Sequence, residues 1–224
     1  MRLHYNTVSK PVLECLQKLM ANPVFDDFVL VGGTALSLQL GHRMSVDIDL
    51  FTANEYGSMN LEDIKTALAT TFSYTDNLDT FSGRSLGYMV HIGNNQTERV
   101  KLDLFYTDDF IAPVVQQDGL RLASVQDIAA MKMQAIVNIK RKKDFWDIYE
   151  LLDHFTLEEM IQFGLERNPY TLTRDEILDS LCHSAELKQD NVIVCLKGNF
   201  WELIVEDLRT IAEQYKKRNI QSTS

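Results

Sequence analysis

The sequence predicts an α+β fold in which a mixed sheet with helices precedes an α-helical half. Two observations carry this prediction. Short apolar segments typical of strands alternate with helical patterns up to about residue 120, and from Ser124 onwards the pattern is almost wholly helical. We therefore expect an α/β domain over residues 1–122 and an α-helical domain over residues 123–224.

Local signals define each element of the first half. Pro11 in a first turn marks a helix start, Gly41 stops the second helix, and a turn over residues 93–95 joins the last two strands. The elements expected here are a helix from Ser9, a strand over 28–31, a helix over 34–40, a strand over 46–51, a helix over 61–71 and strands over 84–92 and 99–106. The helices expected in the second half cover 125–139, 144–153, 156–167, 173–183 and 199–217.

The composition is that of an ordinary globular chain. The 224 residues are 45% hydrophobic and 24% charged, which excludes a disordered or collagen-like chain. The net charge of −10 disfavours indiscriminate binding to nucleic acids, because the overall field repels phosphate. The start lacks signal-peptide features, and no apolar run approaches the roughly 20 residues of a membrane span. We therefore expect a cytoplasmic protein that does not bind membranes.

Two glycines follow the first predicted strand. Gly32 and Gly33 let backbone N–H groups approach a ligand closely, and the partial positive charge of a helix N-terminus favours a phosphate there. Thr34 adds a hydroxyl at the same place. The alternative is a tight strand–helix turn that needs glycine for its geometry alone.

Two aspartates share one side of the predicted strand 46–51. Alternate side chains of a strand point to the same face, so Asp47 and Asp49 lie together and the apolar residues point the other way. Carboxylates this close repel one another, and a bound divalent cation is the commonest remedy. The alternative is the solvent-facing side of an edge strand, with Arg43 near enough to neutralise one carboxylate.

A third carboxylate lies on the predicted strand 99–106, where Lys101 and Asp103 share a face. If this strand lies beside 46–51, Asp103 joins the two aspartates of that strand around one site. Three carboxylates that hold two Mg²⁺ (or Mn²⁺) ions would form the two-metal arrangement that activates phosphoryl transfer.

These residues resemble a known superfamily. Gly33-Thr34, twelve further residues, Asp47-x-Asp49 and a later strand with Asp103 are similar to the DNA polymerase β-type nucleotidyltransferases. The segments VGGTALSLQLGHRMSVDIDLF and KMQAIVNIKRKKDFWDIYELL resemble the AbiEii/AbiGii branch, the toxins of abortive-infection and toxin–antitoxin systems, over roughly residues 25–155. The resemblance implies a nucleotidyltransferase-fold sheet and transfer of a nucleoside monophosphate from an NTP to an acceptor hydroxyl. The active site is expected between the two domains.

Lys132 is unusual on physical grounds as well. It falls inside the apolar arc of its predicted helix, where an ammonium costs free energy unless it finds a partner or snorkels to solvent. The resemblance implies a place in the active site, near the nucleotide phosphates. Asp144, in the first turn of the next helix, reads as a cap or dipole partner, and the resemblance implies that it faces the metal site. Ile139 departs from the family, which has arginine at this position.

The expected site residues form three overlapping sets. The catalytic set is Asp47, Asp49, Asp103, Lys132 and Asp144, and the metal ligands are Asp47, Asp49 and Asp103. The nucleotide-binding set is Gly32, Gly33, Thr34, Arg43, Ser45 and Lys132.

The acceptor and partners are less constrained by the sequence. The run Lys140 to Lys143 is either a solvated helix end, where cations suit the helix dipole, or a contact for a nucleic-acid backbone. The resemblance implies an RNA acceptor such as a tRNA 3′ end, and an antitoxin partner. Alternatives are a non-catalytic NTP-binding regulator, nucleotidylation of a protein hydroxyl, and an adaptor module whose acidic strands merely face solvent.

Overall fold

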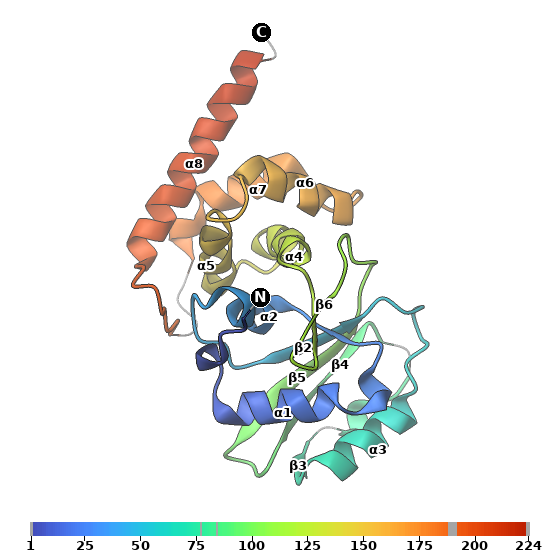
Figure 1. Cartoon of the computed structure of the whole chain (residues 1–224). Coiled ribbons are helices and arrows are strands. Elements are labelled where there is room, and N and C mark those ends of the chain that lie inside the picture. Colours follow the sequence, from blue (N-terminus) through green and yellow to red (C-terminus); the bar gives the residue numbers. More distant parts are fainter. Residues whose placement is uncertain (1, 77, 84, 188–191, 223–224) are drawn as a thin grey trace. The chain divides into compact units, whose positions relative to one another are not determined.

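The computed structural model describes residues 2–76, 78–83, 85–187 and 192–222, and the chain divides into two compact units, Met1–Ser124 and Val125–Ser224 (Figure 1). Strands occur in the first unit, and the described part of the second is helical. The α+β fold class is therefore confirmed. That residues 1–122 and 123–224 fold as separate domains stays a prediction.

The first unit is a mixed sheet with flanking helices. Its elements are η1 (Tyr5–Thr7), α1 (Lys10–Met20), η2 (Pro23–Phe25), β1 (Val29–Leu30), α2 (Gly32–Leu40), β2 (Ile48–Thr52), α3 (Leu61–Thr71), β3 (Tyr74–Thr75), η3 (Leu78–Thr80), β4 (Gly87–Gly93), β5 (Arg99–Tyr106), β6 (Val115–Gln117) and β7 (Leu120–Leu122). In the described residues, seven strands form one sheet in the order β3-β4-β5-β2-β1-β7-β6. The β2–β5 and β1–β7 pairs are parallel, whereas the other pairs are antiparallel.

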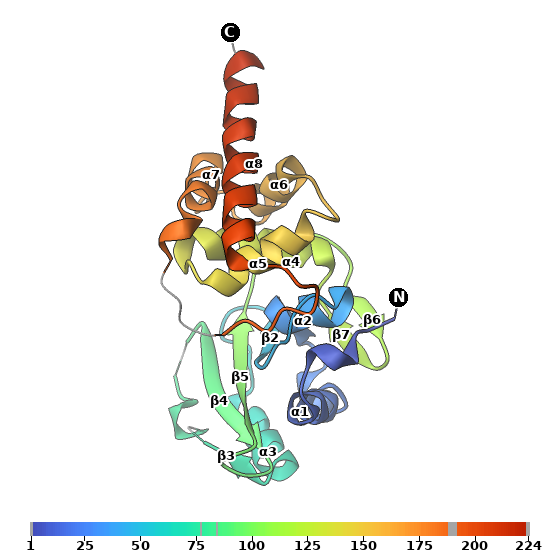
Figure 2. The ribbon, with the colours of Figure 1, turned by 90° about the vertical axis from the view of Figure 1, so that its left-hand side faces the viewer.

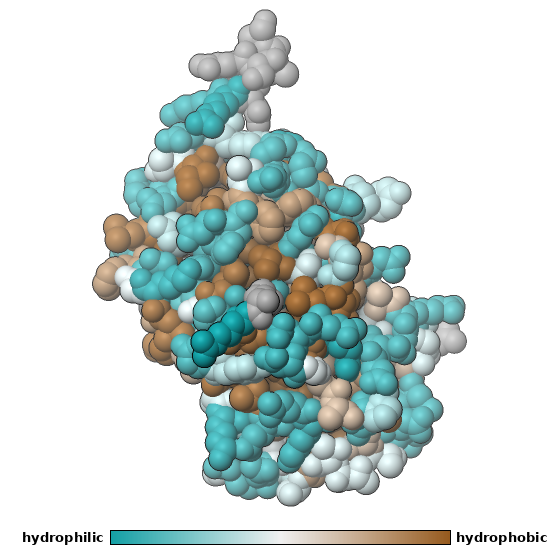
Figure 3. All heavy atoms as spheres, viewed as in Figure 1, coloured by the Kyte–Doolittle hydropathy of each residue, from teal (hydrophilic) through white to brown (hydrophobic). Residues whose placement is uncertain are grey.

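The two faces of the central strands differ in burial. Along β2 and β5 the aliphatic residues Ile48, Leu50, Leu102 and Leu104 are fully buried. α1 contacts β4 and β5, which Figure 2 shows as neighbouring strands, and α1 contributes buried leucines to this core. The alternate positions of β2 and β5 are only half-buried and include the aspartates. Hydrophilic side chains make up most of the surface of this unit on the side shown in Figure 3.

The strand predicted over 46–51 begins later than expected. β2 starts at Ile48, and Val46 is 64% exposed instead of sharing the apolar face. The reason is local: the Thr34 hydroxyl donates to the carbonyl oxygen of Asp47, and Ser45 N–H donates to the carbonyl of Thr7 at 2.8 Å. These bonds hold the segment before β2 against α2 and η1.

Other boundaries also moved. Gly32 already belongs to α2, so the two glycines open the helix and do not form a separate turn. β4 begins at Gly87, and Arg84, where we expected the strand to start, lies outside the described residues. The short strands β3, β6 and β7 were not predicted.

The second unit is built around α4. Its helices are α4 (Val125–Asn138), α5 (Lys142–Leu151), α6 (Leu157–Arg167), α7 (Arg174–Cys182), η4 (Ser184–Glu186) and α8 (Trp201–Ser222). α4 contacts α5, α6 and α7, and α8 contacts α5 and α7. Thr156 and Thr173 each form a capping box, which fixes the starts of α6 and α7.

The basic run spans the end of one helix and the start of the next. α4 stops at Asn138, Lys140 has a left-handed φ of 57°, and Lys142 already belongs to the first turn of α5. Only Lys140, whose N–H donates to the Ala135 carbonyl at 3.0 Å, therefore lies at a helix C-terminus. The interpretation that these cations complement a helix C-terminus is wrong for Lys142 and Lys143, which lie in the first turn of α5. Ile139, the last residue of the helix predicted over 125–139, is 57% exposed because it lies beyond the end of α4.

No helix in the described part of the chain combines the length and the apolar character that crossing a bilayer requires.

Candidate active site

The register of β2 and β5 brings two of the predicted aspartates together. The strands are parallel, and Asp49 is the direct partner of Asp103. Neighbouring strands lie about 4.8 Å apart, so the two half-buried carboxylates lie side by side on one face of the sheet. Asp47 precedes β2 and is also half-buried. The expectation that strand 99–106 lies beside the aspartate strand is confirmed.

Gly32 allows the Asp49 carboxylate to approach the start of α2. A Cβ atom at Gly32 would lie 2.6 Å from Asp49 Oδ2, and the glycine has a φ of +67°. Any other residue at this position would therefore be strained and would push the carboxylate away. Val31 N–H also donates to the Asp49 carbonyl at 2.9 Å. The close approach that we expected for a phosphate is made here by the chain's own carboxylate.

Thr34 and Ser45 are tied into the protein. Both are buried, and their hydroxyl oxygens lie 2.8 Å apart in a hydrogen bond. Because the Thr34 hydroxyl also donates to the Asp47 carbonyl, it anchors the segment that carries Asp47. A nucleotide-binding role for these two hydroxyls stays a prediction.

Arg43 is a buried cation beside the same helix start. It is 4% exposed, and a Cβ atom at Gly33 would collide with its Nη2. Its Nη1 donates to the Met44 carbonyl at 3.0 Å. Gly33 thus makes room for a guanidinium, just as Gly32 makes room for a carboxylate.

Lys101 compensates part of the negative charge of the neighbouring aspartates. Its Nζ lies 2.5 Å from Asp103 Oδ2, with the side chains 35% and 14% exposed. Asp103 Oδ1 is buried and has no hydrogen-bond partner in the part of the chain that the structure describes. A buried carboxylate oxygen without a partner is costly, which leaves Asp103 suited to a further ligand.

The arrangement fits a divalent cation in part. No three His, Cys, Asp or Glu side chains among the described residues lie close enough to share a metal ion as they stand. Asp49 and Asp103 nevertheless form an adjacent pair of hard oxygen donors, one oxygen of which has no partner. The pair therefore fits Mg²⁺ or Mn²⁺, and a contribution from Asp47 stays a prediction.

In the second unit, Lys132 is buried between two carboxylates. Its Nζ lies 2.6 Å from Asp144 Oδ1 and 2.6 Å from Asp147 Oδ2, and both aspartate side chains are fully buried. Arg141 Nε also donates to Asp144 Oδ2 at 2.8 Å. The ammonium therefore has partners inside the protein and does not snorkel to solvent.

The charges of this cluster control the pKa of Asp144. Burial would raise the pKa, but the positive charges and hydrogen bonds of Lys132 and Arg141 outweigh burial and lower it below its usual value. Asp144 is therefore ionised in the folded protein. The sequence analysis missed Asp147, although its spacing of three residues from Asp144 places both on one face of α5.

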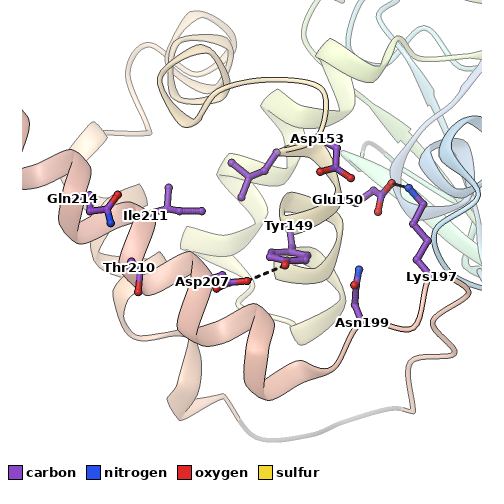
Figure 4. Close-up of a pocket in the computed structure, with 10 residues that line it drawn as sticks. Tyr149, Glu150, Asp153, Lys197, Asn199, Asp207, Thr210, Ile211 and Gln214 are labelled. Carbon is purple, nitrogen blue, oxygen red and sulfur yellow. Dashed lines mark hydrogen bonds and ion pairs between the residues drawn. The ribbon is translucent and has the colours of Figure 1, made fainter.

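A separate cavity of about 520 Å³ lies between α5 and α8 and contains none of the predicted site residues (Figure 4). Figure 4 shows Tyr149 donating to Asp207, at 2.9 Å, and Lys197 paired with Glu150. The hydrogen bond to Asp207 is the main cause that raises the Tyr149 pKa.

Comparison with known proteins identifies a family. Residues 14–186 match the family model described as "Nucleotidyl transferase AbiEii toxin, Type IV TA system". The uncharacterized protein aq_aa25 of Aquifex aeolicus is 29% identical over 224 residues, which cover 93% of this chain and 97% of that protein.

Two solved structures share the fold. MenT4, a nucleotidyltransferase toxin from Mycobacterium tuberculosis, superposes with a TM-score of 0.56 at 12% identity, covering 90% of this chain and 83% of MenT4. JHP933 from Helicobacter pylori gives a TM-score of 0.52 at 18% identity, covering 95% of this chain and 92% of that one.

Proposed function

The chain belongs to the AbiEii nucleotidyltransferase toxin family, and we propose that it transfers a nucleoside monophosphate from an NTP to an RNA hydroxyl, with release of pyrophosphate. The observation that carries the proposal is the pairing of Asp49 with Asp103 across two parallel strands. We place the reaction in the cytoplasm, where NTPs and RNA are available.

The proposed metal ligands are Asp49 and Asp103, joined by Asp47. A divalent ion held there, Mg²⁺ or Mn²⁺, would shield phosphate charge and lower the pKa of the acceptor hydroxyl. The N–H groups at the start of α2, from Gly33 and Thr34, are the proposed donors to phosphate oxygens.

Lys132 and Asp144 are the proposed contribution of the second unit. An ammonium near a phosphate counters the charge that develops on the leaving pyrophosphate. Two buried carboxylates hold this ammonium, so its position is fixed before any substrate arrives. Asp144 thus acts on the reaction by positioning Lys132.

The proposed acceptor is an RNA, with a tRNA 3′ end as the first candidate, and the family's type IV system implies an antitoxin partner. Arg141 is engaged with Asp144, and Lys142 lies 4.8 Å from the centre of the Trp201 ring. Replacing either of these two would also disturb its partner, so the test changes Lys140 and Lys143 of the same run together.

Incubation of the protein with labelled NTPs, Mg²⁺ and total RNA tests the proposal. We expect label on RNA and release of pyrophosphate. Label on a protein instead would favour nucleotidylation of a protein hydroxyl, and nucleotide binding without any transfer would favour the non-catalytic regulator.

The RNA contact has its own test. Replacing Lys140 and Lys143 with Ser should flatten the slope of log affinity against log salt by about 0.7 per lost phosphate contact. The control replaces Lys216 and Lys217 of α8, which makes the same change in net charge. An unchanged slope in the first variant would place the RNA elsewhere.

A further inference from the structure

Lys101 and Asp103 form an ion pair within one strand of the candidate site. They are two residues apart on β5 and so project from the same face, with Nζ 2.5 Å from Oδ2. Across the sheet, His91 of β4 is the direct partner of Lys101, and its Nδ1 lies 3.0 Å from Asp76 Oδ2. His91 is therefore occupied by its own carboxylate.

The pair lies next to a second carboxylate. Asp49 is the partner of Asp103 on β2, so the ammonium is paired with one of two neighbouring carboxylates. Adjacent carboxylates repel one another, and a nearby cation relieves that repulsion. Lys101 therefore supplies, in the metal-free protein, part of the positive charge that a divalent ion would supply.

We propose that Lys101 is a positioning residue that holds Asp103 in the metal-free protein and releases it when a divalent ion binds. The inference rests on the proposed function, since it assumes that Asp49 and Asp103 are metal ligands. The ammonium on Oδ2 and an ion on Oδ1 would share one carboxylate, across which the two positive charges repel. The ammonium and the ion therefore compete for Asp103.

Competition of this kind couples the metal to the nucleotide. An ammonium that leaves Asp103 is available to a phosphate oxygen, so an NTP favours the released state of Lys101. Coupling is reciprocal: if NTP raises the affinity for the ion, the ion raises the affinity for NTP by the same factor. Lys101 would thus keep metal binding weak until the nucleotide is present.

The competing explanation is an ordinary surface ion pair. The Lys101 side chain is 35% exposed, and exposed pairs contribute little to stability. A surface pair predicts no effect of Lys101 on metal affinity, which makes the two explanations separable by experiment.

The experiment measures the dissociation constant of Mn²⁺, by calorimetry or by the electron paramagnetic resonance of the free ion. Lys101→Met should bind Mn²⁺ about tenfold more tightly than the wild type, because a competing positive charge is gone. Lys101→Arg should restore weak binding. The control is Lys65→Met, which makes the same chemical change in a side chain 27% exposed and paired with Glu62 at 2.9 Å.

Nucleotide coupling gives the second measurement. A non-hydrolysable NTP should tighten Mn²⁺ binding to the wild type, and the gain should be clearly smaller in Lys101→Met. If Lys101→Met does not fold, as judged by circular dichroism, Lys101→Gln provides the same comparison.

The outcomes separate this inference from the proposed function. Mn²⁺ binding that is equal in the wild type and the Lys101 variants overturns the inference and leaves the metal site in place. Absence of Mn²⁺ binding in all of them, with and without nucleotide, overturns the metal site and the inference with it.

Discussion

Replacing Lys132 with Met would remove the ammonium that lies between two fully buried carboxylates. Lys132 lies among apolar residues of its helix, and on that basis alone Met would be an acceptable substitute. The structure changes that expectation, because Asp144 and Asp147 each lie 2.6 Å from Nζ and are 0% exposed. Removing one partner of a buried ion pair costs about 3–5 kcal/mol. For a chain of this size each kcal/mol lowers the melting temperature by about 2–4 °C, so we expect a loss of roughly 10 °C.

A second variant separates stability from function. In Lys132→Met, Asp144 keeps its ion pair with Arg141 but Asp147 loses the ammonium, whereas Lys132→Met with Asp147→Asn also removes the carboxylate that lost its cation. We expect the double variant to be more stable than the sum of the single changes, by about 2 kcal/mol. Nucleotidyl transfer should stay lost in both, because neither has the ammonium.

Urea unfolding of the wild type, both single variants and the double variant measures this double-mutant cycle. Additive effects would contradict the buried network, and so would a Lys132→Met protein within about 0.5 kcal/mol of the wild type. Transfer activity that returned with stability in the double variant would make Lys132 a structural residue only.

Three other changes test separate parts of the structure. Gly32→Ala should lower the free energy of unfolding by ~1–2 kcal/mol and weaken Mn²⁺ binding. The control Gly119→Ala, with a φ of +78° and open space around it, should lower the free energy of unfolding through backbone strain alone and leave Mn²⁺ binding unchanged. Because the folded pKa of Asp144 is lowered, the unfolded state binds its proton more readily, and stability should fall as pH drops below about 4. In urea unfolding at several pH values, Asp144→Asn should reduce this dependence of stability on pH. An unchanged dependence would show that other groups cause it. Lys197→Met should destabilise the protein by about 2 kcal/mol in the same assay, since Glu150 is 2% exposed, and a neutral result would show that this pair is solvated.

The alternation of side chains in strands predicted the most useful part of the site. The same-face placement of Asp103 followed from the pattern of its strand, and the pairing of that strand with β2 is observed. The fold class and the helices of the second half also follow from periodicity, with boundaries that moved by a few residues. These features depend on local patterns, which the sequence contains.

The features that could not be predicted depend on long-range contacts. Val46 looks like part of a strand, yet hydrogen bonds from Thr34 and to Thr7 draw its neighbours away from the sheet. The short strands β6 and β7 are too brief to show a period, and they are defined by pairing with each other and by the pairing of β7 with β1. The role of Gly32 depends on the Asp49 carboxylate that packs on it from another element, a contact with no local signal in the sequence.

The central claim is that Asp49 and Asp103 support nucleotidyl transfer, and pyrophosphate release tests it most directly. Wild-type protein, Asp49→Asn, Asp103→Asn and the exposed control Asp109→Asn would each be incubated with NTP, RNA and increasing Mg²⁺. We predict Mg²⁺-dependent release by the wild type and the control, and a loss of at least about a hundredfold in both site variants. Release by Asp49→Asn and Asp103→Asn at the wild-type rate and Mg²⁺ dependence would contradict the account.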